Sequence, residues 1–196
     1  MDAKFAFSLN RFGPTRAEEI TGVVRNTQRD WRRQGYLPSS EGMARYDLFD
    51  LCELWVLGAS AEFGLGPKRA KEFSRSAAIH MAWHCLRLIQ SYEGDHLSAP
   101  ASEHEPSSPP WGRKSRWLAD RIVHGDGDLH PMSECYGVWR DGEATPMPGD
   151  GISYLMPNRD VAKRGGVFVL PLKIAASWLV DTAGEPLVQV TFGTAE

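Results

Sequence analysis

Glycine and proline residues limit the lengths of the elements that the first third of the chain can form. Gly22 ends one segment, and Gly35 followed by Pro38 ends a second one. Glycine tolerates the left-handed backbone found just past helix ends, and proline cannot continue a helix. Two short helices joined by a tight turn are therefore predicted for residues 15–20 and 26–34.

The segments that follow predict a wing and two longer helices. Thr15, with a glutamate three positions later, is expected to cap the first short helix. Residues 37–46 place proline, serine and glycine between apolar ends, which suits a small β-hairpin with Tyr46 on its return strand. Apolar residues at helical spacing predict helices over 47–62 and 67–89.

The last of these helices carries an apolar stripe that recurs every three or four residues. One small helical domain offers little surface to cover such a stripe, so we expect it to form the seam of a homodimer. The stripe consists of Phe73, Ala77, Met81, Cys85 and Leu88.

A polar stretch divides the chain. Residues 94–115 are rich in proline, serine and acidic side chains, a composition typical of a flexible linker. The predicted domains are therefore 1–93, with the short helices and the dimerisation helix, and 116–196.

The second half predicts a small α+β domain. Strands are expected over 135–139, 167–170 and 187–192, with a helix from Pro171 to Val180 between the last two. Ile174, Trp178 and Leu179 are expected to face inward. The predicted fold class of the whole chain is α+β: a mainly α winged helix-turn-helix with a long dimerisation helix, a Pro/Ser-rich linker and this small domain.

The positive charge is concentrated at one end of the chain. The 196 residues hold 22 Lys and Arg against 25 Asp and Glu, so the net charge gives no general attraction to nucleic acid. Residues 1–45 nevertheless hold eight basic and five acidic side chains, whereas residues 46–112 hold five and nine. A nucleic-acid partner is therefore expected at the N-terminal segment.

The second short helix holds side chains that are suited to a DNA groove. Arginine forks match guanine edges and phosphates, and amides match adenine edges. The first turn of the preceding helix adds backbone amides that can hold a phosphate. The predicted DNA-binding residues are Thr15, Arg16, Arg25, Asn26, Thr27, Gln28, Arg29, Arg32, Arg33, Arg45 and Tyr46.

The motifs TGVVRNTQRDWRRQGYLP and GMARYDLFDL resemble the MerR-type winged helix-turn-helix over roughly residues 12–90. In that family the second helix contacts DNA, and the long helix after the wing forms an antiparallel dimer. The resemblance implies that Arg29 is the recognition-helix arginine, with Trp31 beside it. The shorter pattern QRDWRRxG also resembles DNA-binding proteins of phages and prophages.

Two groups of histidines are candidate metal ligands. His80 and His84 lie four residues apart on a predicted helix with Cys85 adjacent, although a packed helix flank explains them more simply. A second group, His124, Asp126, Asp128 and His130, is the best available basis for a hydrolytic metal site. We predict neither a metal nor another cofactor, and we predict no enzyme because no nucleophile triad, P-loop or dinucleotide fingerprint occurs.

The compartment is predicted to be the cytoplasm, with association to the nucleoid. The three cysteines are far apart, and no stretch approaches a signal peptide or a membrane span. The favoured function is a sequence-specific, dimeric transcriptional regulator that binds double-stranded DNA, with a possible protein partner at the C-terminal domain. The alternatives are an excisionase-like or packaging DNA adaptor of a phage, and a protein-interaction module without DNA binding.

Overall fold

The computed structural model describes residues 4–39, 42–127, 130–140, 142–147, 149 and 166–193. In chain order the helices are α1 (Pro14–Thr21), α2 (Arg25–Arg33), α3 (Leu48–Glu62), α4 (Pro67–Cys85), α5 (Pro110–His124) and α8 (Leu172–Ala183). The strands are β1 (Lys4–Leu9), β2 (Tyr92–Gly94), β3 (Cys135–Trp139), β4 (Ala144–Met147), β5 (Val167–Leu170) and β6 (Val188–Gly193), and the 3-10 helices are η1 (Ile89–Ser91) and η2 (Asp95–Ser98). The predicted α+β class is confirmed.

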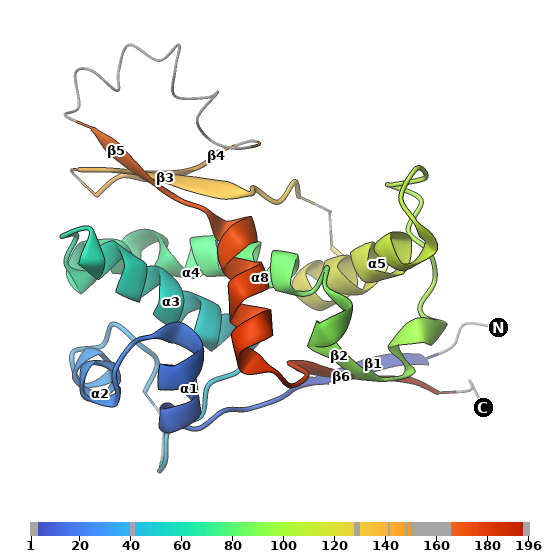
Figure 1. The fold of residues 1–196 in the computed structure, drawn as a ribbon, viewed down its shortest axis with the longest axis horizontal. Helices are drawn as coiled ribbons and strands as arrows, with labels where there is room; N and C mark the ends of the chain where they lie inside the picture. Colours follow the sequence, from blue (N-terminus) through green and yellow to red (C-terminus); the bar gives the residue numbers. More distant parts are fainter. Residues whose placement is uncertain are drawn as a thin grey trace.

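One sheet joins the two ends of the chain. Its strand order is β1-β6-β2, with β6 antiparallel to β1 and parallel to β2. Lys4 pairs with Gly193, and Leu9 pairs with Val188. The first and last described segments therefore lie side by side (Figure 1).

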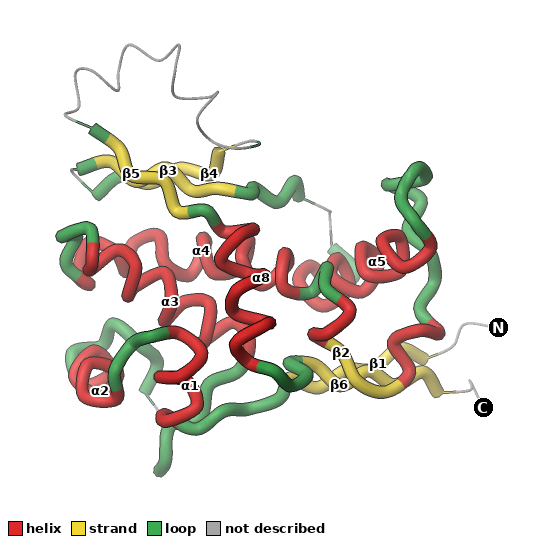
Figure 2. Tube along the Cα trace, in the orientation of Figure 1, coloured by secondary structure: helices red, strands yellow, loops and turns green. Residues whose placement is uncertain are grey.

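The second sheet is a separate antiparallel layer with the order β4-β3-β5. In Figure 2 it lies on the opposite side of the helices from the first sheet. All five residues of β3, the central strand of this sheet, are buried. The predicted strands at 135–139 and 167–170 are confirmed.

Helix α4 lies in the middle of the molecule, where α3, α5 and α8 pack against it. Phe73 is 6% exposed, and the side chains of Ala77, Met81 and Cys85 are fully buried. Leu88 lies beyond the end of the helix and is partly buried against the same core. The predicted dimer seam is therefore wrong, because elements of the same chain already cover this stripe.

Residues 94–115 are folded onto the body of the protein, so the prediction of a flexible linker is corrected. The segment holds the end of β2, all of η2 and the start of α5. Ala99 and Ser102 are buried, and the Ser102 amide donates to the Arg113 carbonyl. One continuous apolar core includes side chains from Phe12 to Val190, so the two predicted halves are packed together.

Glu105 fixes this segment to two helices. Its carboxylate accepts two hydrogen bonds from Arg87, at 2.9 and 2.7 Å, and one from Arg116 at 2.9 Å. The Trp83 ring has these same two guanidinium groups 5.1 and 4.8 Å from its centroid, and its indole N–H donates to Asp120. The hydrogen bonds from Arg87 lower the pKa of Glu105 to about 2.

Replacing Glu105 by Gln is expected to lower the free energy of unfolding at neutral pH by on the order of 2 kcal/mol, because two partly buried arginines lose their counter-charge. The folded-state pKa lies below the ordinary value of 4.5. The stabilisation is therefore complete above pH 4.5 and is lost as the pH falls towards 2. Urea unfolding at several pH values should show this slope in the wild type and in Glu103→Gln, an exposed control, but a smaller slope in Glu105→Gln.

Helix α8 packs on α4 with one face and leaves the other in solvent. Leu172, Ala175 and Leu179 are buried at helical spacing. Ile174 is 72% and Trp178 is 44% exposed, so the prediction that they face inward is wrong, whereas that for Leu179 is confirmed. None of the described helices has the length and apolar character needed to cross a bilayer.

Candidate nucleic-acid interface

Helices α1 and α2 are joined by three residues and have the predicted positions. Gly22 takes the left-handed conformation, with φ of 76°, and its N–H donates to the Glu18 carbonyl, which ends α1. Gly13 occupies the N-cap of α1 without a side-chain cap, so the predicted capping role of Thr15 is wrong. Thr15 is exposed on the first turn instead.

Gln28 holds α2 against α1. Its amide nitrogen donates to the carbonyls of Pro14, at 3.2 Å, and Val23, at 2.7 Å. Trp31, on the same side of α2, is 8% exposed. The predicted DNA contact of Gln28 is therefore corrected, because its side chain is directed into the protein and is 1% exposed.

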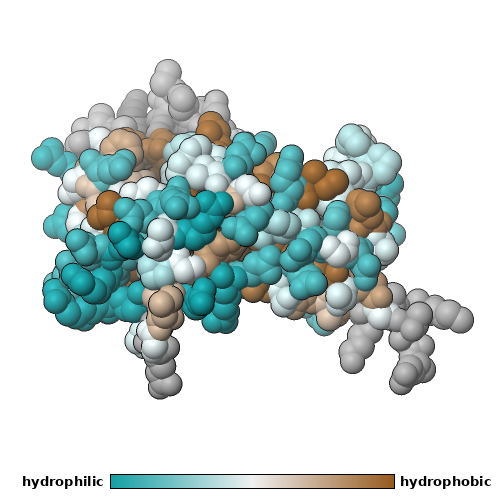
Figure 3. Space-filling model, turned by 60° about the horizontal axis from the view of Figure 1, so that its bottom comes forward, coloured by the Kyte–Doolittle hydropathy of each residue, from teal (hydrophilic) through white to brown (hydrophobic). Residues whose placement is uncertain are grey.

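The outward face of α2 presents polar and basic side chains. Arg25, Asn26, Arg29 and Arg33 are exposed, and Thr27 is half-buried. Figure 3 shows hydrophilic residues gathered on this end of the molecule. The buried residues Gln28 and Trp31 are three positions apart and share one face of the helix, as expected for a short helix that packs against the protein on one side only.

The arginines of α2 differ in how they are held. Arg25 pairs with Glu18 at 3.1 Å, and Arg33 pairs with Asp30 at 3.2 Å. Arg32 donates to the Pro38 carbonyl and lies 4.9 Å from the centre of the Tyr46 ring. The Arg29 side chain makes no hydrogen bond or ion pair with any other described residue, so its guanidinium is available to a ligand.

Arg16 is also engaged within the chain. It pairs with Glu19 at 2.6 Å and with Glu185 at 3.2 Å, and it donates to the Ala183 carbonyl. These contacts connect α1 to the end of α8. The predicted phosphate contact of Arg16 would therefore have to compete with two carboxylates.

The segment between α2 and α3 does not form the predicted hairpin in its described part. The backbones of Tyr46 and Phe12 exchange two hydrogen bonds of 2.9 Å in an isolated antiparallel bridge, so Tyr46 pairs with the residues before α1. Residues 40 and 41 lie outside the described residues. The segment nevertheless extends past α1 and α2 in Figure 1 and carries the exposed Arg45.

The Phe12–Tyr46 bridge also places near α2 a basic residue that is not among the predicted DNA-binding residues. Arg11 lines a hollow of about 310 Å³ together with Arg32, Met43 and Arg45. Arg11 and Arg45 are exposed. Local sequence patterns do not predict this arrangement, because Arg11 precedes the first predicted helix and the bridge joins positions far apart in the chain.

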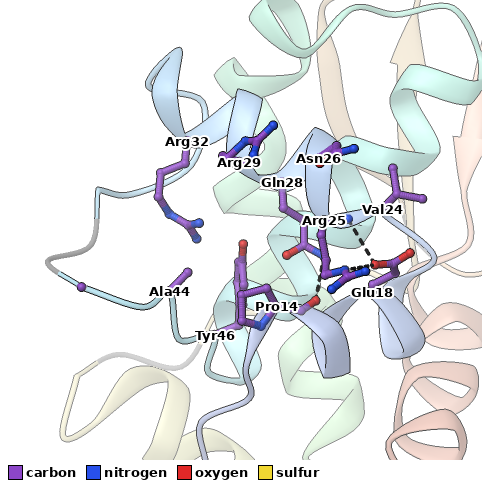
Figure 4. A pocket seen from close by; sticks show the side chains of 11 residues that line it. Pro14, Glu18, Val24, Arg25, Asn26, Gln28, Arg29, Arg32, Ala44 and Tyr46 are labelled. Carbon is purple, nitrogen blue, oxygen red and sulfur yellow. Dashed lines mark hydrogen bonds and ion pairs between the residues drawn. The ribbon is translucent and has the colours of Figure 1, made fainter.

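A groove of about 660 Å³ opens between α1, α2 and the segment before α3 (Figure 4). Arg25, Arg29 and Arg32 line it from one side, and Tyr46 and Ala44 line it from the other. The side-chain oxygen of Gln28 and the hydroxyl of Tyr46 are buried without a hydrogen-bond partner among the described residues. The predicted DNA contact of the Tyr46 side chain is corrected, because this side chain is 1% exposed.

Replacing Tyr46 by Phe is expected to raise the free energy of unfolding by about 1 kcal/mol, because the buried hydroxyl has the Arg32 guanidinium near it but forms no well-aligned hydrogen bond with a described residue. Burial also raises the pKa of this phenol, as expected for a group with little access to water. Thermal unfolding of the two proteins measures the effect. A clear loss of stability in Tyr46→Phe would show that the hydroxyl is hydrogen-bonded after all.

The histidine groups do not form a metal centre in the described part of the chain. The amide of Ser133 donates to His80 Nδ1 at 2.8 Å, and its carbonyl lies 3.1 Å from His84 Nε2. Burial lowers the pKa of His84 to about 4, so it is neutral at pH 7 and can donate to this carbonyl. These two histidines hold the chain before β3.

The second group is only partly described. The rings of His124 and His130 lie 5.9 Å apart, and Asp126 is paired with Arg121. Asp128 lies outside the described residues. Among the described residues, no three metal-ligating side chains come together.

Comparisons of the chain with protein families, curated proteins and solved structures found no match. A function must therefore be inferred from the side chains themselves. Within the described residues, the α2 face combines exposed arginines, an exposed amide and an adjacent groove. Such a surface is suited to an extended anion that offers hydrogen-bond acceptors.

Proposed function

We propose that the protein binds double-stranded DNA, with α1 and α2 acting as a helix-turn-helix and α2 entering the major groove. The observation that carries the proposal is the guanidinium of Arg29, which no described residue pairs, on the outward face of a helix fixed to its neighbour. A rigid helix can present such a group without first breaking a contact inside the protein. Regulation of transcription by sequence-specific binding, in the cytoplasm at the nucleoid, is the role we propose for it.

The dimensions of α2 support this assignment. An α-helix with its side chains is about 10–12 Å across, which fits the major groove of about 12 Å, and the nine residues of α2 extend roughly 13 Å along it. Its inward side chains, Gln28 and Trp31, are already committed to the protein core. The remaining face offers Asn26 for adenine edges and Arg29 for guanine edges, the pairings that their hydrogen-bonding groups favour.

The neighbouring segments supply groups for the phosphates. Arg45 and Arg11 are exposed beside α2, and Thr15 lies on the first turn of α1. Contacts of this kind position a protein on the duplex without reading its sequence. We therefore assign base reading to α2 and backbone contact to these flanking residues.

The test is selection from a pool of random duplexes with the full chain, followed by sequencing, at two salt concentrations. An enriched motif whose affinity falls steeply with salt would support the proposal. Salt-sensitive binding without a motif would indicate DNA binding that does not depend on sequence. Absence of duplex binding at both salt concentrations would overturn the proposal and favour the protein-interaction module.

An adaptor that binds DNA as a single copy is the second candidate. The burial of the α4 stripe favours it, because the helix expected to pair two subunits is covered by α3 and α8. A regulator that works as a dimer needs another contact surface and should select an inverted repeat. A single, non-repeated site that is bent on binding would favour the adaptor.

A further inference from the structure

A second basic groove lies away from the α2 face, between the α3–α4 turn and the β4-β3-β5 sheet. It has a volume of about 790 Å³. Its walls come from the end of α3, the first turn of α4, β3 and the start of β5. The side chains used below are Phe63, Lys68, Arg69, Arg140 and Phe168, all of which line it.

The groove carries positive charge that the described residues do not neutralise. Lys68, Arg69 and Arg140 are exposed, and their side chains form no ion pair or hydrogen bond with another described residue. None of the described residues that line the groove is acidic. The first turn of α4, a helix of 19 residues, adds the positive end of its dipole. The groove is therefore suited to a phosphate-bearing ligand.

The same groove contains an aromatic platform. The rings of Phe63 and Phe168 are stacked, with centroids 4.7 Å apart and planes inclined by 16°. Phe63 is nevertheless 63% exposed. An exposed phenyl ring beside three cations offers a surface for a flat ring joined to an anion.

Two glycines border this surface. A Cβ atom on Gly142, where φ is 94°, would lie within 3.3 to 3.6 Å of the Arg69 side chain, so the stem of Arg69 runs close along the β3–β4 turn. Gly66 has φ of −59°, a value that any residue can adopt, and a Cβ atom there would meet nothing within 4 Å. A glycine at position 66 is thus required neither by the backbone nor by close packing.

We propose that this groove binds single-stranded nucleic acid, with a base stacked on Phe63 and phosphates held by Lys68, Arg69 and Arg140. An open groove with a largely exposed ring cannot enclose a small ligand, as pockets for small molecules do. A strand gains affinity from several weak contacts along its length, so it suits the open shape better. This activity goes beyond the proposed duplex binding and uses different residues.

The test measures the fluorescence anisotropy of a labelled oligothymidylate of roughly 10 nucleotides with the full chain. Phe63→Leu keeps an apolar side chain but removes the ring, and it should weaken binding by about ten-fold, as should Phe63→Ala. Arg69→Gln with Arg140→Gln should reduce the slope of log affinity against log salt by roughly 0.7 for each phosphate that these arginines neutralise. Circular dichroism of each variant checks that the fold is retained.

Arg29→Ala provides the matched control. It should leave binding of the single-stranded oligothymidylate unchanged while it weakens binding to the selected duplex. Phe63→Leu should weaken binding of the oligothymidylate and leave duplex binding unchanged. Failure of the proposed duplex function would thus leave strand binding intact. The strand proposal is overturned if the wild type does not bind oligothymidylate, if Phe63→Leu binds it as well as the wild type does, or if thymidine monophosphate competes as effectively as the strand.

Discussion

An Arg29→Ala variant is expected to bind the selected duplex more weakly by about 1–3 kcal/mol, which corresponds to roughly a 5- to 150-fold rise in Kd. Arg29 is exposed on the outward face of α2, and no described residue neutralises it. Its removal should therefore leave the folded protein unchanged and delete an interaction made only in the complex. The effect should be largest for the preferred sequence, so the preference at one base pair should weaken.

The control for this prediction is Arg121→Ala, which removes the same charge from α5 at the far end of the molecule (Figure 1). Binding curves for the preferred duplex and for a scrambled duplex distinguish the roles of Arg29. Equal weakening on both sequences would make Arg29 a phosphate contact. Undiminished affinity for the preferred duplex would exclude α2 as the recognition helix.

Replacing Gly94 by alanine is expected to lower the free energy of unfolding by about 3 kcal/mol or more. Gly94 has φ of 79°, and a Cβ atom there would collide with the backbone carbonyl oxygen of Val190. The two residues belong to the parallel pairing of β2 with β6. Because a strand backbone cannot yield as a flexible side chain can, the substitution should separate the two strands.

Gly66→Ala is the matched control for Gly94→Ala. Its φ of −59° and the open space before it allow a methyl group without strain. It should leave stability unchanged or raise it by roughly 0.4–1 kcal/mol, because alanine has less freedom in the unfolded chain. Urea unfolding of both variants gives the comparison, and a small effect for Gly94→Ala would show that the strands can move apart at little cost.

Local signals in the sequence were sufficient for most elements. Gly22 and Gly35 ended two helices at the expected places, and the apolar runs at 135–139 and 167–170 became strands. These features depend on backbone preferences and on side-chain periodicity over a few residues. The helical face of α2 followed for the same reason, because spacing along a short helix determines which side chains share a side.

Contacts between segments far apart in the chain could not be predicted from these local sequence signals. The polar composition of residues 94–115 did not indicate that Glu105 would pair with Arg87 and Arg116. The composition of a segment is the same whether its charged side chains are paired within the fold or exposed to solvent. The stripe on α4 was recognised as apolar, but periodicity does not say whether α8 or a second copy covers it. The inward direction of Gln28 and the proximity of Arg11 to Arg45 likewise depend on tertiary packing.

The position of β6 has a consequence for how the protein is made. Its residues, 188–193, pair with residues 4–9 and with residues 92–94, so the shared sheet requires the most distant parts of the described chain. During synthesis β1 and β2 leave the ribosome before β6, so they remain unpaired until β6 has been made. A nascent chain that contains β1 and β2 but not yet residues 188–193 therefore exposes two unpaired strand edges. We expect nascent chains of this kind to depend most strongly on chaperones.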